Sequence, residues 1–289
     1  MNLIQARAHF RSNLNKLYTV QECDYFFKMI LSSALNIDPL ALALEPNQIL
    51  TAEQHSSLNS IVADLLKEKP LQYILGEVSF RKLSLKVNPL VLIPRPETEE
   101  LVGWILEDYG NQNRKIELID MGTGSGCIAL SLKQEQPSFN VHALDLNPSI
   151  LDLVQQNAVR NKVEIHCIQG DMNELNQLKL KVEAIVSNPP YITPEEKNQM
   201  KNNVLHFEPH QALFVPQEDP LLFYRNLLEY AESNLSPNGK IYFEINPLFE
   251  RELERLIFSF ESYSITKRLD IFGKIRMLRL EKTAHDSGS

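Results

Sequence analysis

The spacing of apolar residues divides the chain into a helical first quarter and a longer region in which strands and helices alternate. Up to residue 70 the apolar positions recur every three or four residues and glycine is absent, which predicts a small helical bundle. Two helix starts have the capping-box pattern, in which side chains three positions apart satisfy free N–H groups: Thr19 with Glu22, and Thr51 with Gln54. Because Pro70 ends the last helix, we expect the bundle to span residues 1–72.

Each of these two helices has an apolar face that we expect to be buried. The predicted faces are Tyr25, Phe26, Met29, Ile30 and Leu31 in the first, and Leu58, Ile61, Leu65 and Leu66 in the second. The bundle carries nearly balanced charge, which favours a packing or docking role over nucleic-acid binding.

Residues 73–95 predict a β-hairpin that links the bundle to a second domain. Residues 78–85 alternate in character, Asn88-Pro89 is a turn signal, and residues 90–93 form a second apolar run. A helix follows in which Glu97 and Glu99 lie in the first turn, where acidic side chains suit the positive end of the helix. We expect the second domain to span residues 96–283 and the tail 284–289 to be disordered.

Strands and helices alternate from Lys115 onward, which predicts that the second domain is a doubly wound parallel sheet, an α/β fold. The candidate strands are residues 116–120, 141–145, 163–168, 182–187, 241–245, 263–269 and 275–280. The link between the last two strands, at residues 270–273, is too short for a parallel crossover, so the final strand must run antiparallel. This seven-stranded arrangement resembles the sheet of Rossmann-like S-adenosylmethionine-dependent methyltransferases.

A glycine loop follows the first strand of this sheet and opens a helix. Glycine lets the backbone turn sharply and lets a ligand approach the N–H groups at the helix start. The spacing is Gly-x-Gly-x-Gly, not the Gly-x-Gly-x-x-Gly of nicotinamide enzymes. The sequence therefore predicts a nucleotide-type cofactor site whose loop residues are Gly122, Thr123, Gly124, Ser125 and Gly126.

Polar residues at the ends of the next strands extend this candidate site. Asp145 ends the second strand, where a carboxylate can accept both hydroxyls of a ribose; its alternative role, capping the next helix, is better filled by Asn147. Asp171 and Met172 follow the third strand and are expected to flank an adenine ring, by accepting from its amine and packing on its face. Parallel strand ends meet at one crevice, so we expect Asn188, after the fourth strand, to lie there too.

The stretch Asn188-Pro189-Pro190-Tyr191 predicts the acceptor end of the site. Prolines hold the backbone extended and have no N–H, so nearby carbonyls stay free to accept from a ligand. Asn188 adds an amide and Tyr191 a flat ring, which together suit a planar –NH2 group. Taken alone, the stretch is equally consistent with a proline-rich turn, and the glycine loop upstream favours the functional interpretation.

Composition narrows the class of protein. The net charge of −8 argues against a protein that holds nucleic acid by its backbone phosphates. The three cysteines are far apart and in apolar surroundings, which favours buried reduced thiols over disulfides or a metal site. Because the sequence has neither a membrane-length apolar run nor a signal-peptide core, we expect a cytoplasmic protein.

Together these motifs resemble the peptide chain release factor glutamine methyltransferases, the HemK family. The resemblance covers nearly the whole chain and rests on Gln72-Tyr73-Ile74-Leu75-Gly76, residues 93–99, the loop 120–126 and Asn188-Pro189-Pro190-Tyr191. The last motif also occurs in DNA adenine methyltransferases and therefore indicates the acceptor chemistry, whereas Arg95-Pro96-Glu97-Thr98-Glu99 discriminates better. Where Met172 stands, the family commonly has an aromatic residue.

The resemblance implies an enzyme of translation termination that methylates the glutamine of the Gly-Gly-Gln motif in class 1 peptide chain release factors, with S-adenosylmethionine as cofactor. Asn188 and the Pro189 carbonyl would accept from the glutamine amide, while Pro190 and Tyr191 would form walls around it. The helical bundle would help to dock the partner. We expect a monomer with no metal, no membrane association and no direct nucleic-acid binding.

Two other interpretations remain open at this point. A nucleic-acid adenine N6-methyltransferase would use the same Asn-Pro-Pro-Tyr pocket, although the acidic chain lacks a basic, aromatic-rich segment. A non-catalytic cofactor-binding module would keep the glycine loop without turnover on any amide, although the intact acceptor motif argues against it.

Overall fold

The computed structural model describes residues 1–289 except 111, 113, 261 and 283–289, so the predicted tail 284–289 lies outside the described residues. The chain forms two compact units, the first comprising Met1–Glu77 and Lys201–Phe207, the second Val78–Met200 and Glu208–Ser289. None of the helices among the described residues has both the length and the apolar character needed to cross a membrane. All three cysteines are free; Cys23 and Cys127 are buried, and Cys167 is half-buried.

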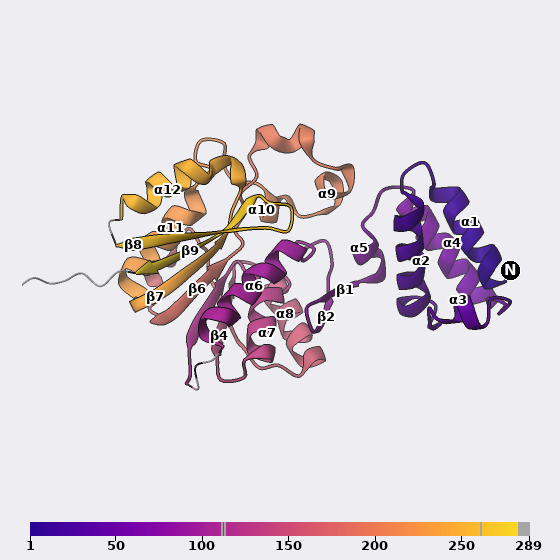
Figure 1. Ribbon diagram of the computed structural model, residues 1–289, viewed down its shortest axis with the longest axis horizontal. Helices are drawn as coiled ribbons and strands as arrows, with labels where there is room; N and C mark the ends of the chain where they lie inside the picture. Colours follow the sequence, from indigo (N-terminus) through magenta and orange to yellow (C-terminus); the bar gives the residue numbers. More distant parts are fainter. Residues whose placement is uncertain (111, 113, 261, 283–289) are drawn as a thin grey trace, which may run out of the picture. The chain divides into compact units, whose positions relative to one another are not determined.

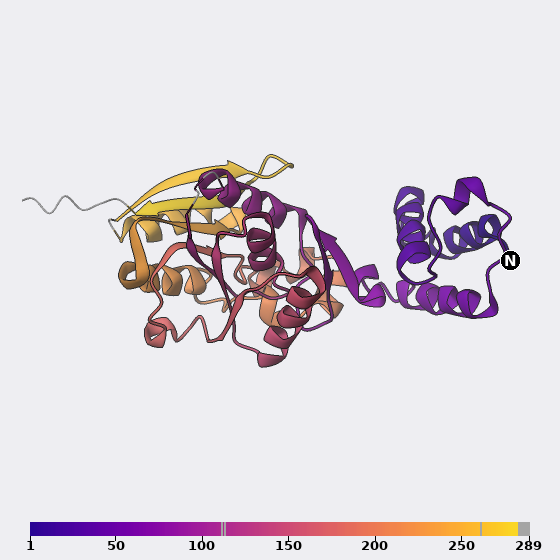
Figure 2. The same cartoon turned by 90° about the horizontal axis from the view of Figure 1, so that it is seen from below.

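The first unit contains the helices of the N-terminal region, as expected, and one further segment, residues 201–207 (Figure 1, Figure 2). Its helices are α1 (Leu3–Leu14), α2 (Val20–Ser33), α3 (Ala41–Leu44), α4 (Ala52–Leu65), α5 (Leu71–Leu75) and α9 (Asn202–Phe207). Both predicted capping boxes are confirmed: the Thr19 and Thr51 hydroxyls accept from the N–H groups of Glu22 and Gln54 at 3.2 and 3.1 Å. These caps fix where α2 and α4 begin and so which face each helix turns to the core.

The buried faces of the two helices differ in part from the prediction. In α2 the buried side chains are Cys23, Phe27, Ile30 and Leu31, whereas Tyr25 is 60% exposed. In α4 the face is Leu58, Ile61, Val62 and Leu65, and Leu66 is 47% exposed. The prediction for α4 is therefore right for three of its four residues, whereas that for α2 is right only for Ile30 and Leu31.

A two-stranded hairpin, β1 (Glu77–Phe80) and β2 (Leu83–Lys86), lies where the chain passes into the second unit. The hairpin is therefore shorter than predicted and turns at Arg81, whose φ is +49°. The prediction of a strand at residues 90–93 was wrong: these residues have no regular secondary structure. Val91 and Ile93 are buried, while Leu90 and Leu92 face a cavity.

The main sheet has seven strands in the order β5-β4-β3-β6-β7-β9-β8, which confirms the predicted Rossmann-like fold (Figure 1). The strands are β3 (Glu117–Met121), β4 (Asn140–Asp145), β5 (His166–Gln169), β6 (Val182–Ser187), β7 (Leu235–Glu244), β8 (Tyr263–Leu269) and β9 (Ile275–Lys282). The first five pair in parallel, and the final strand β9 lies antiparallel between β7 and β8. The prediction that the last strand runs antiparallel is confirmed.

Helices bury both faces of this sheet. On one face, α6 (Pro96–Tyr109), α7 (Cys127–Glu135), α8 (Pro148–Asn161) and the β1-β2 hairpin share one apolar core with the strands. On the other face, α11 (Leu222–Asn234) and α12 (Glu250–Phe258) share a second core with them. A sheet covered on both sides explains why strands such as β6 consist almost wholly of apolar residues.

The register of the parallel strands aligns their carboxyl ends. Met121 at the end of β3 is paired with Leu144 in β4, and Ser187 at the end of β6 is paired with Phe243 in β7. The next residues along each strand therefore meet at one edge of the sheet. This edge is where open α/β sheets bind their ligands.

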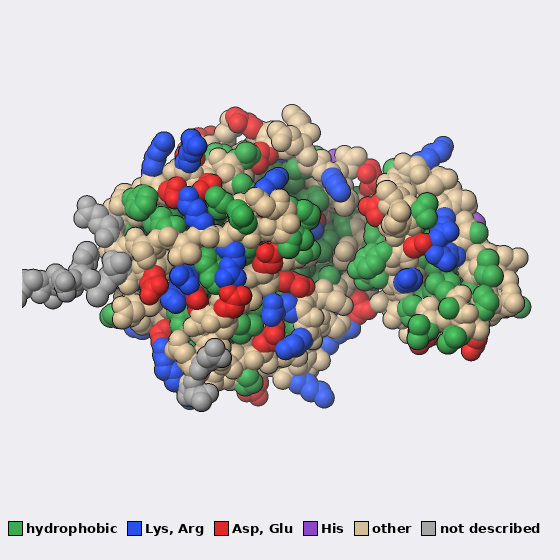
Figure 3. Space-filling view, in the orientation of Figure 1, with side chains coloured by type: hydrophobic (Ala, Val, Ile, Leu, Met, Phe, Trp, Pro, Cys, Tyr) green, Lys and Arg blue, Asp and Glu red, His purple; other side chains and the backbone are tan. Residues whose placement is uncertain are grey.

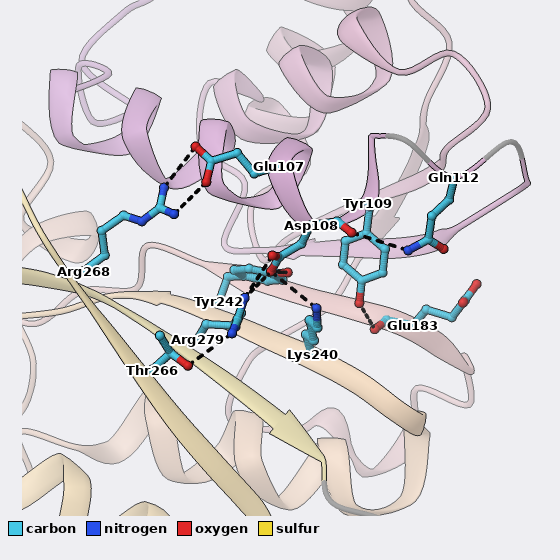
Figure 4. A network of polar contacts seen from close by, with 10 residues as sticks. All are labelled: Glu107, Asp108, Tyr109, Gln112, Glu183, Lys240, Tyr242, Thr266, Arg268 and Arg279. Atoms are coloured by element: carbon cyan, nitrogen blue, oxygen red, sulfur yellow. Dashed lines mark hydrogen bonds and ion pairs between the residues drawn. The ribbon is translucent and has the colours of Figure 1, made fainter.

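A network of polar contacts fixes the C-terminal half of α6 to the sheet (Figure 4). Asp108 accepts from the Tyr242 hydroxyl at 2.6 Å and the Arg279 guanidinium at 2.9 Å, and the ammonium of Lys240 lies 3.5 Å away. Although burial raises the pKa of Asp108, these donors outweigh it and hold that pKa below its usual value. The acidic residue just before it in the helix, Glu107, pairs with Arg268, but its side chain is 61% exposed.

We predict that Asp108→Ala lowers the free energy of unfolding by about 2–3 kcal/mol, because it leaves partly buried cations without their counter-charge. The matched variant Glu107→Ala removes an arginine partner from the same helix turn at the surface and should cost at most about 1 kcal/mol. Urea unfolding of both variants measures the difference. Equal losses would contradict the assignment of Asp108 as the anchor of α6.

Candidate active site

The glycine loop joins β3 to α7 in a conformation that favours glycine. The φ angles of Gly122, Gly124 and Gly126 are +75°, +54° and +80°, in the left-handed region that side chains disfavour. A Cβ added to Gly122 would lie 3.1 Å from Cε of Met172, whereas one added to Gly124 would meet no atom within 4 Å. Gly124 therefore leaves its backbone open to the cavity beside it, which is what close approach of a ligand requires.

Two buried polar side chains hold the loop from behind. Asp120, fully buried, accepts from the Thr123 hydroxyl at 2.6 Å and from the N–H of Ala129 in α7 at 3.3 Å. Asn157, in α8, donates from Nδ2 to the carbonyl of Ser125 at 3.0 Å. The conformation of the loop is thus fixed by contacts to β3, α7 and α8.

Burial raises the pKa of Asp120 to about 7, against the opposing effect of the hydrogen bonds from Thr123 and Ala129. Its second oxygen, Oδ1, has no hydrogen-bond partner among the described residues. A carboxyl group without a second donor is easier to bury in its neutral form, which is consistent with the direction of this shift.

Asp145 ends β4 directly beside the loop. Its Oδ2 accepts from the N–H of Gly124 at 3.0 Å, and its Oδ1 accepts from the N–H of Asn147 at 3.2 Å. Burial raises the pKa of Asp145, while these N–H groups oppose the shift. Asn147 itself caps α8 by accepting from the N–H of Ser149, as predicted, so Asp145 is not needed as the cap.

The residues after β5 complete this end of the site. Oδ1 of Asp171 accepts from both the backbone and the side-chain nitrogen of Asn173, at 2.8 and 2.9 Å, which holds the turn after the strand. Met172 lies over Gly122 and packs against the second apolar core. Both side chains line the same cavity as Asp145.

The Asn-Pro-Pro-Tyr stretch divides between the cavity and the interior. Asn188 and Pro190 line the cavity. Pro189 is buried, and Tyr191 turns its hydroxyl inward to Oε1 of Glu244 at 3.1 Å. Burial and the charge of Glu244 raise the pKa of Tyr191 well above its usual value, so this hydroxyl stays protonated.

One cavity of about 240 Å³ brings most of the predicted residues together. The predicted residues that line it are Gly122, Thr123, Gly124, Ser125, Asp145, Asp171, Met172, Asn188 and Pro190. Gly126, Pro189 and Tyr191 are not among the lining residues. Apolar side chains dominate the lining, as in most small-molecule sites.

One wall of this cavity was not predicted from the sequence. Residues 89–95 and 209–212 contribute Leu90, Val91, Leu92, Arg95, Pro209 and Gln211. Glu208 joins the two segments, since its carboxylate, 1% exposed, accepts from the Arg95 guanidinium at 2.5 Å and the N–H of Ile93 at 3.2 Å. An apolar run after an Asn-Pro turn signal looks like a strand, and the distant glutamate that holds it irregular could not be paired with it from sequence.

Two further polar residues at the acceptor end were also missed. Thr98, 2% exposed, lies in the first turn of α6, where the neighbouring glutamates suggested only helix capping. Glu244 is likewise 2% exposed and ends the apolar strand β7. The signal that could have found Glu244 is a carboxylate closing a run of buried strand residues, because such a group needs specific partners.

Comparisons with known proteins follow the same division of the chain. The PrmC N-terminal domain family model matches residues 5–76, and the Methyltransferase small domain model matches residues 105–212. The release factor glutamine methyltransferase of Flavobacterium psychrophilum is 40% identical over 276 residues, which cover 95% of this chain and 97% of that protein. The enzyme of that name from Bacteroides thetaiotaomicron is 38% identical over 272 residues, covering 94% and 97%.

A solved structure of ribosomal protein L11 methylase from Lactobacillus delbrueckii subsp. bulgaricus has the same fold, with a TM-score of 0.51 and 18% identity over 72% of this chain and 100% of that one. The sheet order and the glycine loop are those of a Rossmann-like methyltransferase. At 40% identity over nearly its whole length, the chain belongs to the family of release factor glutamine methyltransferases, as the motifs predicted.

We predict that Asp120→Asn changes how stability depends on pH. Because the folded-state pKa of Asp120, about 7, lies above its unfolded value, its contribution is full near pH 4 and is lost as pH rises toward 7. The unfolding free energy of the unsubstituted protein, relative to the Asn variant, should fall by up to about 4 kcal/mol from pH 4 to pH 8. Urea titrations at several pH values test this, and a difference that does not change with pH would contradict it.

Proposed function

We propose that the protein transfers a methyl group from S-adenosylmethionine to the side-chain amide nitrogen of the glutamine in the Gly-Gly-Gln motif of bacterial class 1 peptide chain release factors. The observation that carries the proposal is the single cavity that joins the glycine loop and Asp145 to Asn188. Relatives named release factor glutamine methyltransferase supply the acceptor class. A cytoplasmic location and a monomeric state stay predictions.

The residues at the first end of the cavity fit the proposed cofactor. Gly122 to Gly126 would hold its methionine part, since the backbone at Gly124 has no side chain in the way. Asp145, already oriented by the N–H groups of Gly124 and Asn147, would accept from the ribose hydroxyls. Asp171 and Met172 would flank the adenine. The bound sulfonium would supply a reactive methyl group.

The second end of the cavity would orient the acceptor amide. The lone pair of an amide nitrogen is delocalised, so the protein has to position this group rather than rely on its reactivity. Asn188 Oδ1 and the carbonyl of Pro189 would accept its two N–H bonds, and Pro190 would form a wall beside it. The side chain of Tyr191 would support this wall from the interior, because its hydroxyl is held by Glu244.

No strong base is available for the acceptor in this arrangement of described residues. The Tyr191 hydroxyl donates to Glu244 and its pKa is raised by burial, and Asn188 cannot take a proton at neutral pH. Both carboxylate oxygens of Glu244 accept from hydroxyl groups, and Thr98 lies between this carboxylate and Asn188. The proton would therefore leave after methyl transfer, when the amide nitrogen is cationic and acidic.

A nucleic-acid adenine methyltransferase with the same pocket is the competing proposal. On the face shown in Figure 3, basic and acidic side chains of the described residues are interspersed rather than gathered by sign. The chain is also acidic overall, with a net charge of −8. A protein acceptor fits this charge distribution better than a phosphate backbone does. We propose that the helical unit, residues 1–72, helps to dock that acceptor.

We predict opposite defects at the two ends of the cavity. Asp145→Ala should raise the dissociation constant of S-adenosylmethionine about tenfold or more, because charge-assisted hydrogen bonds to the ribose are lost. Asn188→Ala should keep that constant within about twofold and lower methyl transfer by about 100-fold or more, since it removes only acceptor positioning. Calorimetric titration and initial rates separate the two effects, and retained transfer in Asn188→Ala would overturn the acceptor assignment.

The acceptor class is tested by offering labelled S-adenosylmethionine with two substrates, recombinant release factor and unmodified duplex DNA. We expect the label on the release factor, located by mass spectrometry on the peptide that contains Gly-Gly-Gln and absent with the Asn188→Ala variant. Label on the DNA alone would favour the adenine methyltransferase.

A further inference from the structure

A buried carboxylate is linked to the acceptor end of the cavity through the hydroxyl group of a single residue. Glu244 closes β7 and is 2% exposed. Its Oε2 accepts from the hydroxyl of Thr98 at 2.7 Å, and its Oε1 accepts from the hydroxyl of Tyr191 at 3.1 Å. In the structure both hydroxyls donate to Glu244, and its ionised form enforces this direction because it has no hydrogen of its own to donate.

Thr98 passes this constraint on to Asn188. A hydroxyl has one hydrogen, and that of Thr98 is already donated to Glu244, so toward its other neighbours the oxygen can only accept. The neighbour that it accepts from is Nδ2 of Asn188, at 3.3 Å. The amide of Asn188 is thereby oriented with its nitrogen toward Thr98.

We propose that Glu244 is a positioning residue for the methyl transfer: through Thr98 it fixes the Asn188 amide so that Oδ1, and not Nδ2, faces the cavity. The proposal rests on the proposed function, in which this oxygen accepts from the N–H of the acceptor amide. With the amide reversed, Nδ2–H would face the N–H groups of the acceptor. Two donors would then meet, and the acceptor would lose its alignment with the methyl group.

The surroundings of Glu244 hold this hydrogen-bond chain in one geometry. The hydroxyl of Tyr224, in α11, donates to the backbone carbonyl of Glu244 at 2.9 Å. Nδ2 of Asn246 donates to the carbonyl of Tyr191 at 3.1 Å, which ties the end of the acceptor stretch to the end of β7. Thr98 is part of α6, the helix anchored through Asp108 at its other end. Burial raises the pKa of Glu244, and the two hydroxyls and the charge of Arg276 oppose that shift.

Glu244→Gln is the most informative variant, because glutamine keeps the shape of the glutamate side chain and allows the hydrogen bonds through Thr98 to Asn188 to reverse their direction. If the new amide presents its oxygen to Tyr191 and its nitrogen to Thr98, then Thr98 is free to donate to Oδ1 of Asn188. In this reversed arrangement every hydroxyl hydrogen has an acceptor. If the glutamine amide were turned the other way, its N–H group would point at the hydroxyl of Tyr191, which would lose its acceptor. Glutamine at this position therefore favours the wrong orientation of Asn188.

For Glu244→Gln we expect kcat for release factor methylation to fall about tenfold or more, with the dissociation constant of S-adenosylmethionine within about twofold of the unsubstituted value. The side-chain amide resonances of Asn188, assigned by their loss in Asn188→Ala, should shift in spectra recorded without any acceptor. Glu99→Gln is the matched control: it makes the same change one residue after Thr98, where the carboxylate accepts from the N–H of Arg81 at 3.0 Å. This control should leave kcat and those resonances unchanged.

Threonine variants provide a second test if Glu244→Gln fails to fold. Thr98→Val removes the hydroxyl and should shift the Asn188 resonances and lower kcat, whereas Thr98→Ser keeps the hydroxyl and should restore both. Unmoved resonances, or an unchanged kcat, in Glu244→Gln or folded Thr98→Val would overturn the proposal. The resonances are read without acceptor, so they decide the orientation of Asn188 even if the unsubstituted protein methylates no release factor, a result that would instead overturn the proposed function.

Discussion

The parallel register of β4, β3, β6 and β7 is the constraint on which the site depends. Pairing of Met121 with Leu144 places Gly122 beside Asp145, and pairing of Ser187 with Phe243 places Asn188 beside Glu244. A slip of one residue in either pair would turn the strand-end side chains to the opposite face of the sheet. The apolar cores on both faces prevent such a slip, because they specify which side chains of each strand point up or down.

Three carboxyl groups lie along this edge, those of Asp120 and Glu244 buried and that of Asp145 half-buried, and each organises a different part of the cavity. Asp120 holds the glycine loop, Asp145 is oriented by that loop toward the proposed cofactor, and Glu244 orients the polar groups at the acceptor end. Burial raises the pKa of all three, so each depends on its hydroxyl or N–H donors. The donors lie in α6, α7 and the loops. The orientation of the polar groups at this edge of the sheet therefore depends on where these helices sit.

Local patterns in the sequence predict the parts of this structure that short segments determine. The seven strands, the antiparallel last strand, both capping boxes and the glycine loop each depend on residues close together in the chain. The pairs that complete the cavity do not: Glu208 holds Arg95, and Thr98 meets both Glu244 and Asn188, across 90 residues or more in each case. The irregular run after Asn88-Pro89 was misread for the same reason, because a buried N–H···carboxylate bond from Ile93 to Glu208 replaces the expected strand pairing.

A crystal structure of the protein with S-adenosylhomocysteine and a peptide containing Gly-Gly-Gln would test most directly whether both reactants bind in one cavity. We expect the nucleoside between Asp145 and Met172, and the glutamine amide nitrogen within hydrogen-bond distance, about 3 Å, of Asn188 Oδ1 and the carbonyl of Pro189. We also expect Thr98 to keep its contacts to Asn188 and Glu244. A glutamine bound away from Asn188, or a nucleoside at another edge of the sheet, would contradict the central claim that one cavity holds both reactants.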